Sequence, residues 1–119
     1  MAQEIMYEAL NELNSYLARL NKGINDAVEY FRSEKEDEGI KLLIQIIEGL
    51  QWSMEVVFKT KPILEEYGIN LDEGQLKELF KELISGLENK DYILIADLLE
   101  YEILELIRSW QEGLKKMQK

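Results

Sequence analysis

Carboxylates are the most numerous groups in this sequence that could do chemistry. The 119 residues include 24 Asp and Glu but no His and no Cys. The commonest general base, the commonest nucleophile and the usual transition-metal ligands are therefore absent together. The Ser and Thr residues have no imidazole to activate them, and no glycine-rich phosphate loop is present. The remaining chemistry is that of converging carboxylates, acting as acid and base or holding a hard divalent cation.

The densest group of acids lies in residues 33–39. Ser33 and Glu36 have the spacing of a capping box, and Glu34, Asp37 and Glu38 gather where a helix dipole favours negative charge. The alternating Asp and Asn ligands of a calcium loop are missing, and the Glu-x-x-His motif of di-iron bundles requires a His. We interpret the run as the solvated start of a helix. We expect no catalytic residue, no metal and no cofactor, with a carboxylate-based divalent-metal enzyme as the alternative.

Four segments repeat apolar residues every three or four positions, the period of an amphipathic helix. They cover about residues 3–32, 33–61, 72–88 and 92–117. The first and third segments show one apolar face, whereas the second and fourth show two. We predict an all-α, up-and-down bundle of four main helices with a short extra helical element near residues 62–67. The whole chain, residues 1–119, forms one domain.

The fourth segment carries more apolar residues than a simple bundle requires. Its core stripe includes Leu99, Leu106 and Trp110, while Leu94, Leu98 and Tyr101 form a second stripe behind it. Asp97 lies among these rear residues and must be paired, protonated or hydrated. We interpret Leu94, Asp97, Leu98 and Tyr101 as partner-binding residues. The alternatives are a homodimer through this helix, or burial under residues 62–71.

Trp52 is a further candidate for partner binding. It falls on the second stripe of its helix, beside Gly49 and Val56. Tryptophan is favoured at the energetic centres of protein interfaces. The alternative is that Trp52 is buried under residues 62–69.

The charge pattern indicates which partners to expect. The net charge is -10, and only Lys115, Lys116 and Lys119 form anything like a basic cluster. We therefore expect no nucleic-acid binding, because that affinity comes largely from Lys and Arg on phosphates. The N-terminus has no basic and apolar leader, and no window approaches about 18 continuous apolar residues. We expect a cytoplasmic protein with no membrane partner.

Two short stretches resemble known families. Residues 88–104, from Glu88 to Leu104, resemble a segment of small acidic helical-bundle proteins of unknown function from anaerobic Gram-positive bacteria. Residues 20–24, Leu-Asn-Lys-Gly-Ile, are similar to the Leu-Tyr-x-Gly pattern of flagellar export chaperones, with Asn21 in place of the aromatic residue. The second resemblance implies a helical bundle that holds a terminal segment of an exported protein.

These observations favour a non-catalytic protein–protein interaction module, chaperone-like or regulatory, that binds a protein partner or a second copy. A structural homodimer without another ligand is a further alternative. The surplus apolar stripes carry this interpretation, because each must be covered by something.

Overall fold

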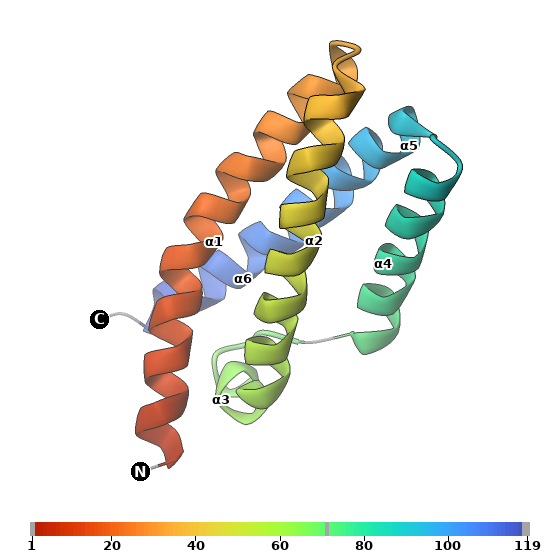
Figure 1. Cartoon of the computed structure of the whole chain (residues 1–119). Helices are drawn as coiled ribbons and strands as arrows, with labels where there is room; N and C mark the ends of the chain where they lie inside the picture. Colours follow the sequence, from red (N-terminus) through yellow and green to blue (C-terminus); the bar gives the residue numbers. More distant parts are fainter. Residues whose placement is uncertain (1, 71, 118–119) are drawn as a thin grey trace.

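Four long helical rods form where the apolar residues recur at helical period, and they run alternately up and down (Figure 1). A computed structural model describes residues 2–70 and 72–117, and within these ranges it contains helices and no strand. The predicted all-α bundle with one short extra element is confirmed. The elements are α1 (Ala2–Arg32), α2 (Glu36–Lys59), α3 (Lys61–Glu66), α4 (Glu73–Glu88), α5 (Tyr92–Asp97), the π-helical turn η1 (Leu98–Ile103) and α6 (Leu104–Met117).

The helix ends follow local hydrogen bonding. The carboxylates of Asp72 and Asp91 accept hydrogen bonds from the backbone N–H of Gln75 and Leu94, at 3.0 and 3.1 Å, and so cap α4 and α5. The expected capping box at Ser33 is wrong, and α2 begins at Glu36. The Ser33 N–H instead bonds back to the carbonyls of Glu29 and Tyr30 and so closes the last turn of α1.

Helices α1 and α2 form a close antiparallel hairpin because two glycines leave room for aromatic rings. A Cβ atom on Gly39 would meet the ring of Phe31 at 2.8 Å, and one on Gly49 would overlap the hydroxyl of Tyr16. The side of α2 that carries Gly49 therefore faces α1. This is the side that the sequence presented as a second stripe.

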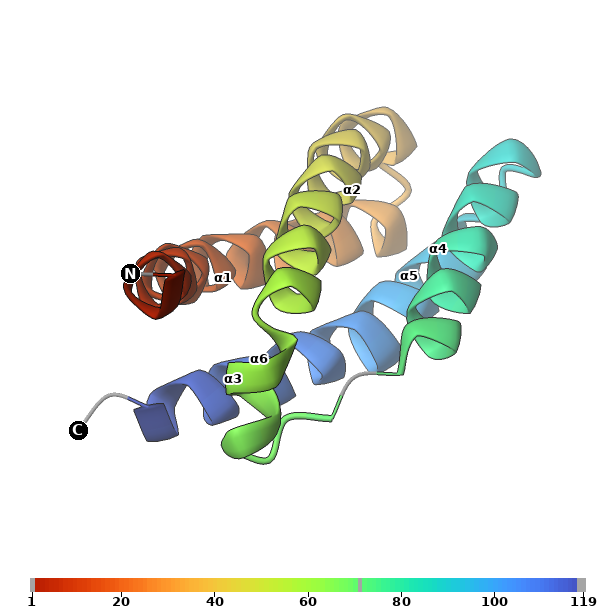
Figure 2. The ribbon, with the colours of Figure 1, turned by 90° about the horizontal axis from the view of Figure 1, so that it is seen from below.

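The last rod, formed by α5, η1 and α6, is buried on more than one side. Its first part packs against both α1 and α4, and α6 continues along α1 (Figure 2). Ile95 and Ile107 are both fully buried. In an uninterrupted α-helix, residues twelve apart would point about 120° away from each other. The π turn between them takes an additional residue per turn and brings both onto the core side.

The π turn also changes which residues form the core. The sequence predicted Leu106 in the core stripe, but Leu106 is only partly buried and its neighbour Ile107 takes the core position. Trp110 is buried as predicted. The difference from the predicted stripe after the π turn is thus a local one, at Leu106 and Ile107.

Helices α2 and α4 are apart along their lengths in both views (Figures 1 and 2). The main neighbours of α2 are α1 and α3, and those of α4 are α5 and η1. Helix α3 follows α2 in the connection to α4, and Ile69, beyond α3, packs against Gly113 of α6. The bundle is consequently open along its α2–α4 edge.

Gly23 lies within α1, and a Cβ atom there would meet no atom within 4 Å apart from its chain neighbours and the local backbone of α1. We therefore expect Gly23→Ala to raise the free energy of unfolding by about 0.5–1 kcal/mol, because Gly loses more backbone entropy in a helix than Ala does. Urea denaturation followed by circular dichroism measures the change. Gly49→Ala is the matched control and should destabilise, since its methyl group would overlap Tyr16. Equal effects of the two substitutions would contradict the packing of α1 on α2.

Candidate functional site

An apolar groove lies at the open edge between α2 and α4. Its volume is about 990 Å³, and its lining comes from these two helices alone. The apolar side chains are Met54 and Phe58 from α2 with Phe80 and Ile84 from α4. Ile84 is 46% exposed, an unusual position for a large aliphatic side chain between two helices. The rim is polar and consists of Gln51, Glu55, Lys77, Lys81, Ser85 and Glu88.

The groove exists because each of its helices has two adjacent lines of apolar residues. On α4, one line is buried against the rest of the bundle and includes Leu76, Leu79 and Leu83. The neighbouring line, Phe80 and Ile84, faces the groove. The sequence interpretation of this helix as one-sided missed this division. The signal in the sequence was the width of the apolar face of α4. Six apolar residues within twelve positions are more than contact with a single neighbouring helix requires.

On α2, both apolar stripes are partly buried. In the main stripe predicted from the period, Leu43 and Leu50 are buried, Met54 and Phe58 are half-buried, and Ile44 is exposed. The second stripe contributes Gly49 to the core, because α1 approaches α2 closely there. The end of the main stripe, Met54 and Phe58, borders the groove.

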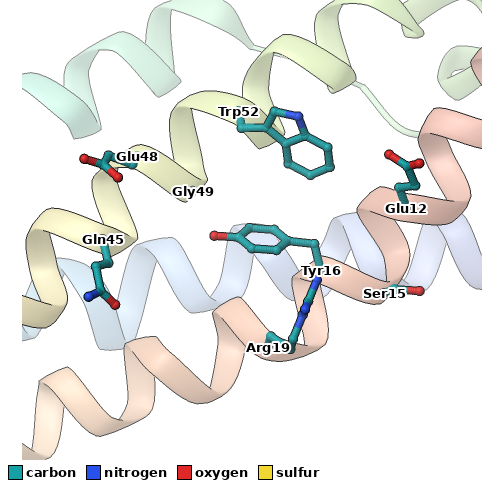
Figure 3. Close-up of a pocket in the computed structure, with 8 residues that line it drawn as sticks. All are labelled: Glu12, Ser15, Tyr16, Arg19, Gln45, Glu48, Gly49 and Trp52. Carbon is teal, nitrogen blue, oxygen red and sulfur yellow. The ribbon is translucent and has the colours of Figure 1, made fainter.

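A second hollow lies between α1 and α2 and contains Trp52 (Figure 3). Its volume is about 670 Å³. The edge of the Trp52 ring packs on Tyr16 with 5.3 Å between ring centroids, and the guanidinium of Arg19 lies 5.5 Å from the Tyr16 centroid. The Tyr16 hydroxyl points to Gly49. Trp52 is thus held partly buried by an aromatic residue of its own chain.

The structure separates the other residues predicted to bind a partner. Leu94 and Tyr101 are on the surface, and Tyr101 is 67% exposed, but Leu98 is only 3% exposed. The expectation that these three form one exposed stripe is wrong. Leu98 lies about 60° around the helix from Ile95, and the apolar face is wide here because α1 and α4 both pack on this segment. Ile93, which is 75% exposed, joins Leu94 on the surface.

Asp97 has a partner that the sequence did not indicate. The Arg32 guanidinium, at the end of α1, donates hydrogen bonds to Asp97 at 2.9 Å and to Glu100 at 2.7 Å. These hydrogen bonds raise the pKa of Arg32 above its ordinary value, and the bond to Asp97 has the largest effect. All three side chains are more than a third exposed, so each pair contributes at most about 1 kcal/mol. The contact joins α1 to the π turn, whereas Arg108 pairs with Glu105.

The carboxylates do not converge in the part of the chain that the structure describes. Between residues 2–70 and 72–117, no three of the Asp and Glu side chains are grouped so that they could hold a metal ion. Within the same ranges, no helix has both the length and the apolar character needed to cross a membrane.

Comparison with known protein families identifies the family to which this chain belongs. Residues 8–113 match the family model described as domain of unknown function DUF8042. The chain belongs to the DUF8042 family. No curated protein and no solved structure matches the chain. The matched range includes both helices of the groove as well as the π turn, so the DUF8042 domain contains the whole candidate site.

The burial of Leu98 leads to a stability prediction. Leu98→Ala should lower the free energy of unfolding by about 2–5 kcal/mol, because it leaves a cavity in the core. Tyr101→Ala, one turn away and exposed, should change it by less than about 0.5 kcal/mol. Urea denaturation of the two variants provides the comparison. A small effect at Leu98 would show that this residue lies on the surface and would contradict the observed packing.

Proposed function

We propose that the protein is a non-catalytic protein–protein interaction module that holds an amphipathic helix of a partner protein in the α2–α4 groove. The observation that carries this proposal is the groove itself, with apolar side chains on two helices that face a common space. Recognition of a helix by its apolar face is an established mode of binding.

The spacing of the lining residues suits a helical occupant. Gln51, Met54 and Phe58 follow each other at intervals of three and four on α2. Lys77, Phe80 and Ile84 do the same on α4. These intervals form the holes into which the side chains of another helix pack. From Lys77 to Glu88 the groove extends for about 16 Å, which accommodates three turns of helix. A docked helix would occupy the open edge of the bundle.

The concave shape of the site favours a partner protein over a second copy. Two copies joined groove to groove across a two-fold axis would enclose a void between the two concave surfaces. Insertion of a convex face of another copy, such as the exposed face at Ile93, would give a dimer or a larger assembly, which light scattering detects. A helix from a different chain fills the groove without a void and without self-association.

The resemblance of residues 20–24 to flagellar export chaperones supports a chaperone-like or regulatory role, since those bundles hold a segment of another protein. The resemblance of residues 88–104 to proteins of anaerobic Gram-positive bacteria supports a bacterial source. The proposal includes the cytoplasmic location expected from the sequence.

Binding of synthetic helical peptides tests the proposal. Three fluorescein-labelled peptides of about 14 residues share one stripe of Leu at heptad spacing and carry Glu, Lys or Gln on the polar face. We expect at least one of them to bind with a Kd in the micromolar range, about -8 kcal/mol, in fluorescence polarisation. Ile84→Glu should weaken this binding by about tenfold or more, because the new carboxylate would lose water on contact with an apolar stripe.

Ile93→Glu is the matched control, since it makes the same substitution at an exposed position of α5, away from the groove. It should leave the affinity unchanged, and far-ultraviolet circular dichroism should show that both variants remain folded. Failure of all three peptides to bind would overturn the proposed function. Equal losses in the two variants would show that the peptides bind elsewhere.

A further inference from the structure

The charges on the rim of the groove are unevenly distributed between its two sides. Lys77 and Lys81 lie one turn apart on α4, whereas the acidic rim residues are Glu55 on α2 and Glu88 at the far end of α4. The chain as a whole carries a net charge of -10, with 14 Lys and Arg against 24 Asp and Glu. Two adjacent lysines beside an apolar groove are therefore a local exception to the charge of the molecule.

The two lysines are not used to stabilise α4. Among residues 2–70 and 72–117, the ion pairs formed by Lys and Arg involve Lys22, Arg32, Lys61 and Arg108, and neither Lys77 nor Lys81 has a carboxylate within 4.0 Å. Like charges four residues apart destabilise a helix by about 0.2–0.5 kcal/mol. An acidic group placed between them would remove this repulsion. Because both ammonium groups lie on the groove rim, a bound helix can supply that group.

We propose that the helix held in the groove is acidic on the side that lies against α4, with carboxylates that pair with Lys77 and Lys81. This inference rests on the proposed function and specifies the chemistry of the partner. The apolar stripe of the partner contacts Met54, Phe58 and Ile84 and supplies most of the affinity. The acidic residues then distinguish this partner from other amphipathic helices, since rim charges contribute mainly to specificity and association rate.

The same three peptides test this inference. The long-range electrostatic attraction of the whole protein favours the Lys peptide, which is opposite to the preference that we predict. A protein of net charge -10 attracts a basic peptide over distance, so a preference for the Glu peptide can arise only from a local contact. We expect the Glu peptide to bind at least about tenfold more tightly than the Lys peptide at low salt, with the difference reduced at high salt.

Charge reversal locates the effect. In Lys77→Glu/Lys81→Glu the preference should change in favour of the Lys peptide. Lys115→Glu/Lys116→Glu is the matched control, because it makes the same change in net charge at exposed positions near the end of α6. The control should retain the preference for the Glu peptide.

The possible outcomes separate the two proposals. If no peptide binds, the proposed function fails and this inference fails with it. If the Lys peptide binds the unmodified protein as tightly as the Glu peptide, or more tightly, the groove remains a helix site but the acidic partner is wrong. If light scattering shows a dimer that Ile84→Glu converts to a monomer, a second copy fills the groove and both statements about the partner are overturned.

Discussion

The simultaneous packing of residues 92–103 against α1 and α4 is the constraint on which the rest of the fold depends. A helix that is buried on two sides needs a wide apolar face, and the π turn keeps Ile95 and Ile107 on that face over twelve residues. Helix α4 packs on this rod, and α2 is not among its main neighbours. The open edge of the bundle follows from this arrangement.

The other side of α2 is equally constrained. Gly49 admits the ring of Tyr16, which brings α1 close to one side of α2. Met54 and Phe58 are half-buried opposite Phe80 and Ile84. The packing of the core thus leaves an apolar surface with charged residues around it, at an edge where α2 and α4 do not contact each other along their lengths. A surface of this kind suits the proposed binding of a helix.

The sequence allowed the elements to be predicted much better than the faces they bury. Periodicity and capping residues such as Asp72 and Asp91 depend on near neighbours, so the helices and most of their boundaries could be derived. The π turn is not visible in a fixed period of 3.6, and the burial of Leu98 depends on two distant helices. The groove was missed for the same reason. Apolar residues such as Phe80 and Ile84 have the same spacing in a closed bundle, and only tertiary packing decides whether a neighbour covers them.

The central claim is that the α2–α4 groove receives a helix. Its most direct test is a titration of ¹⁵N-labelled protein with the Glu peptide, followed through the amide chemical shifts. The account predicts that the largest changes occur in residues 51–58 and 77–88, with small changes around Tyr16 and Trp52. If the largest chemical-shift changes occurred instead in residues 92–101, or around the hollow between α1 and α2, the account would be contradicted.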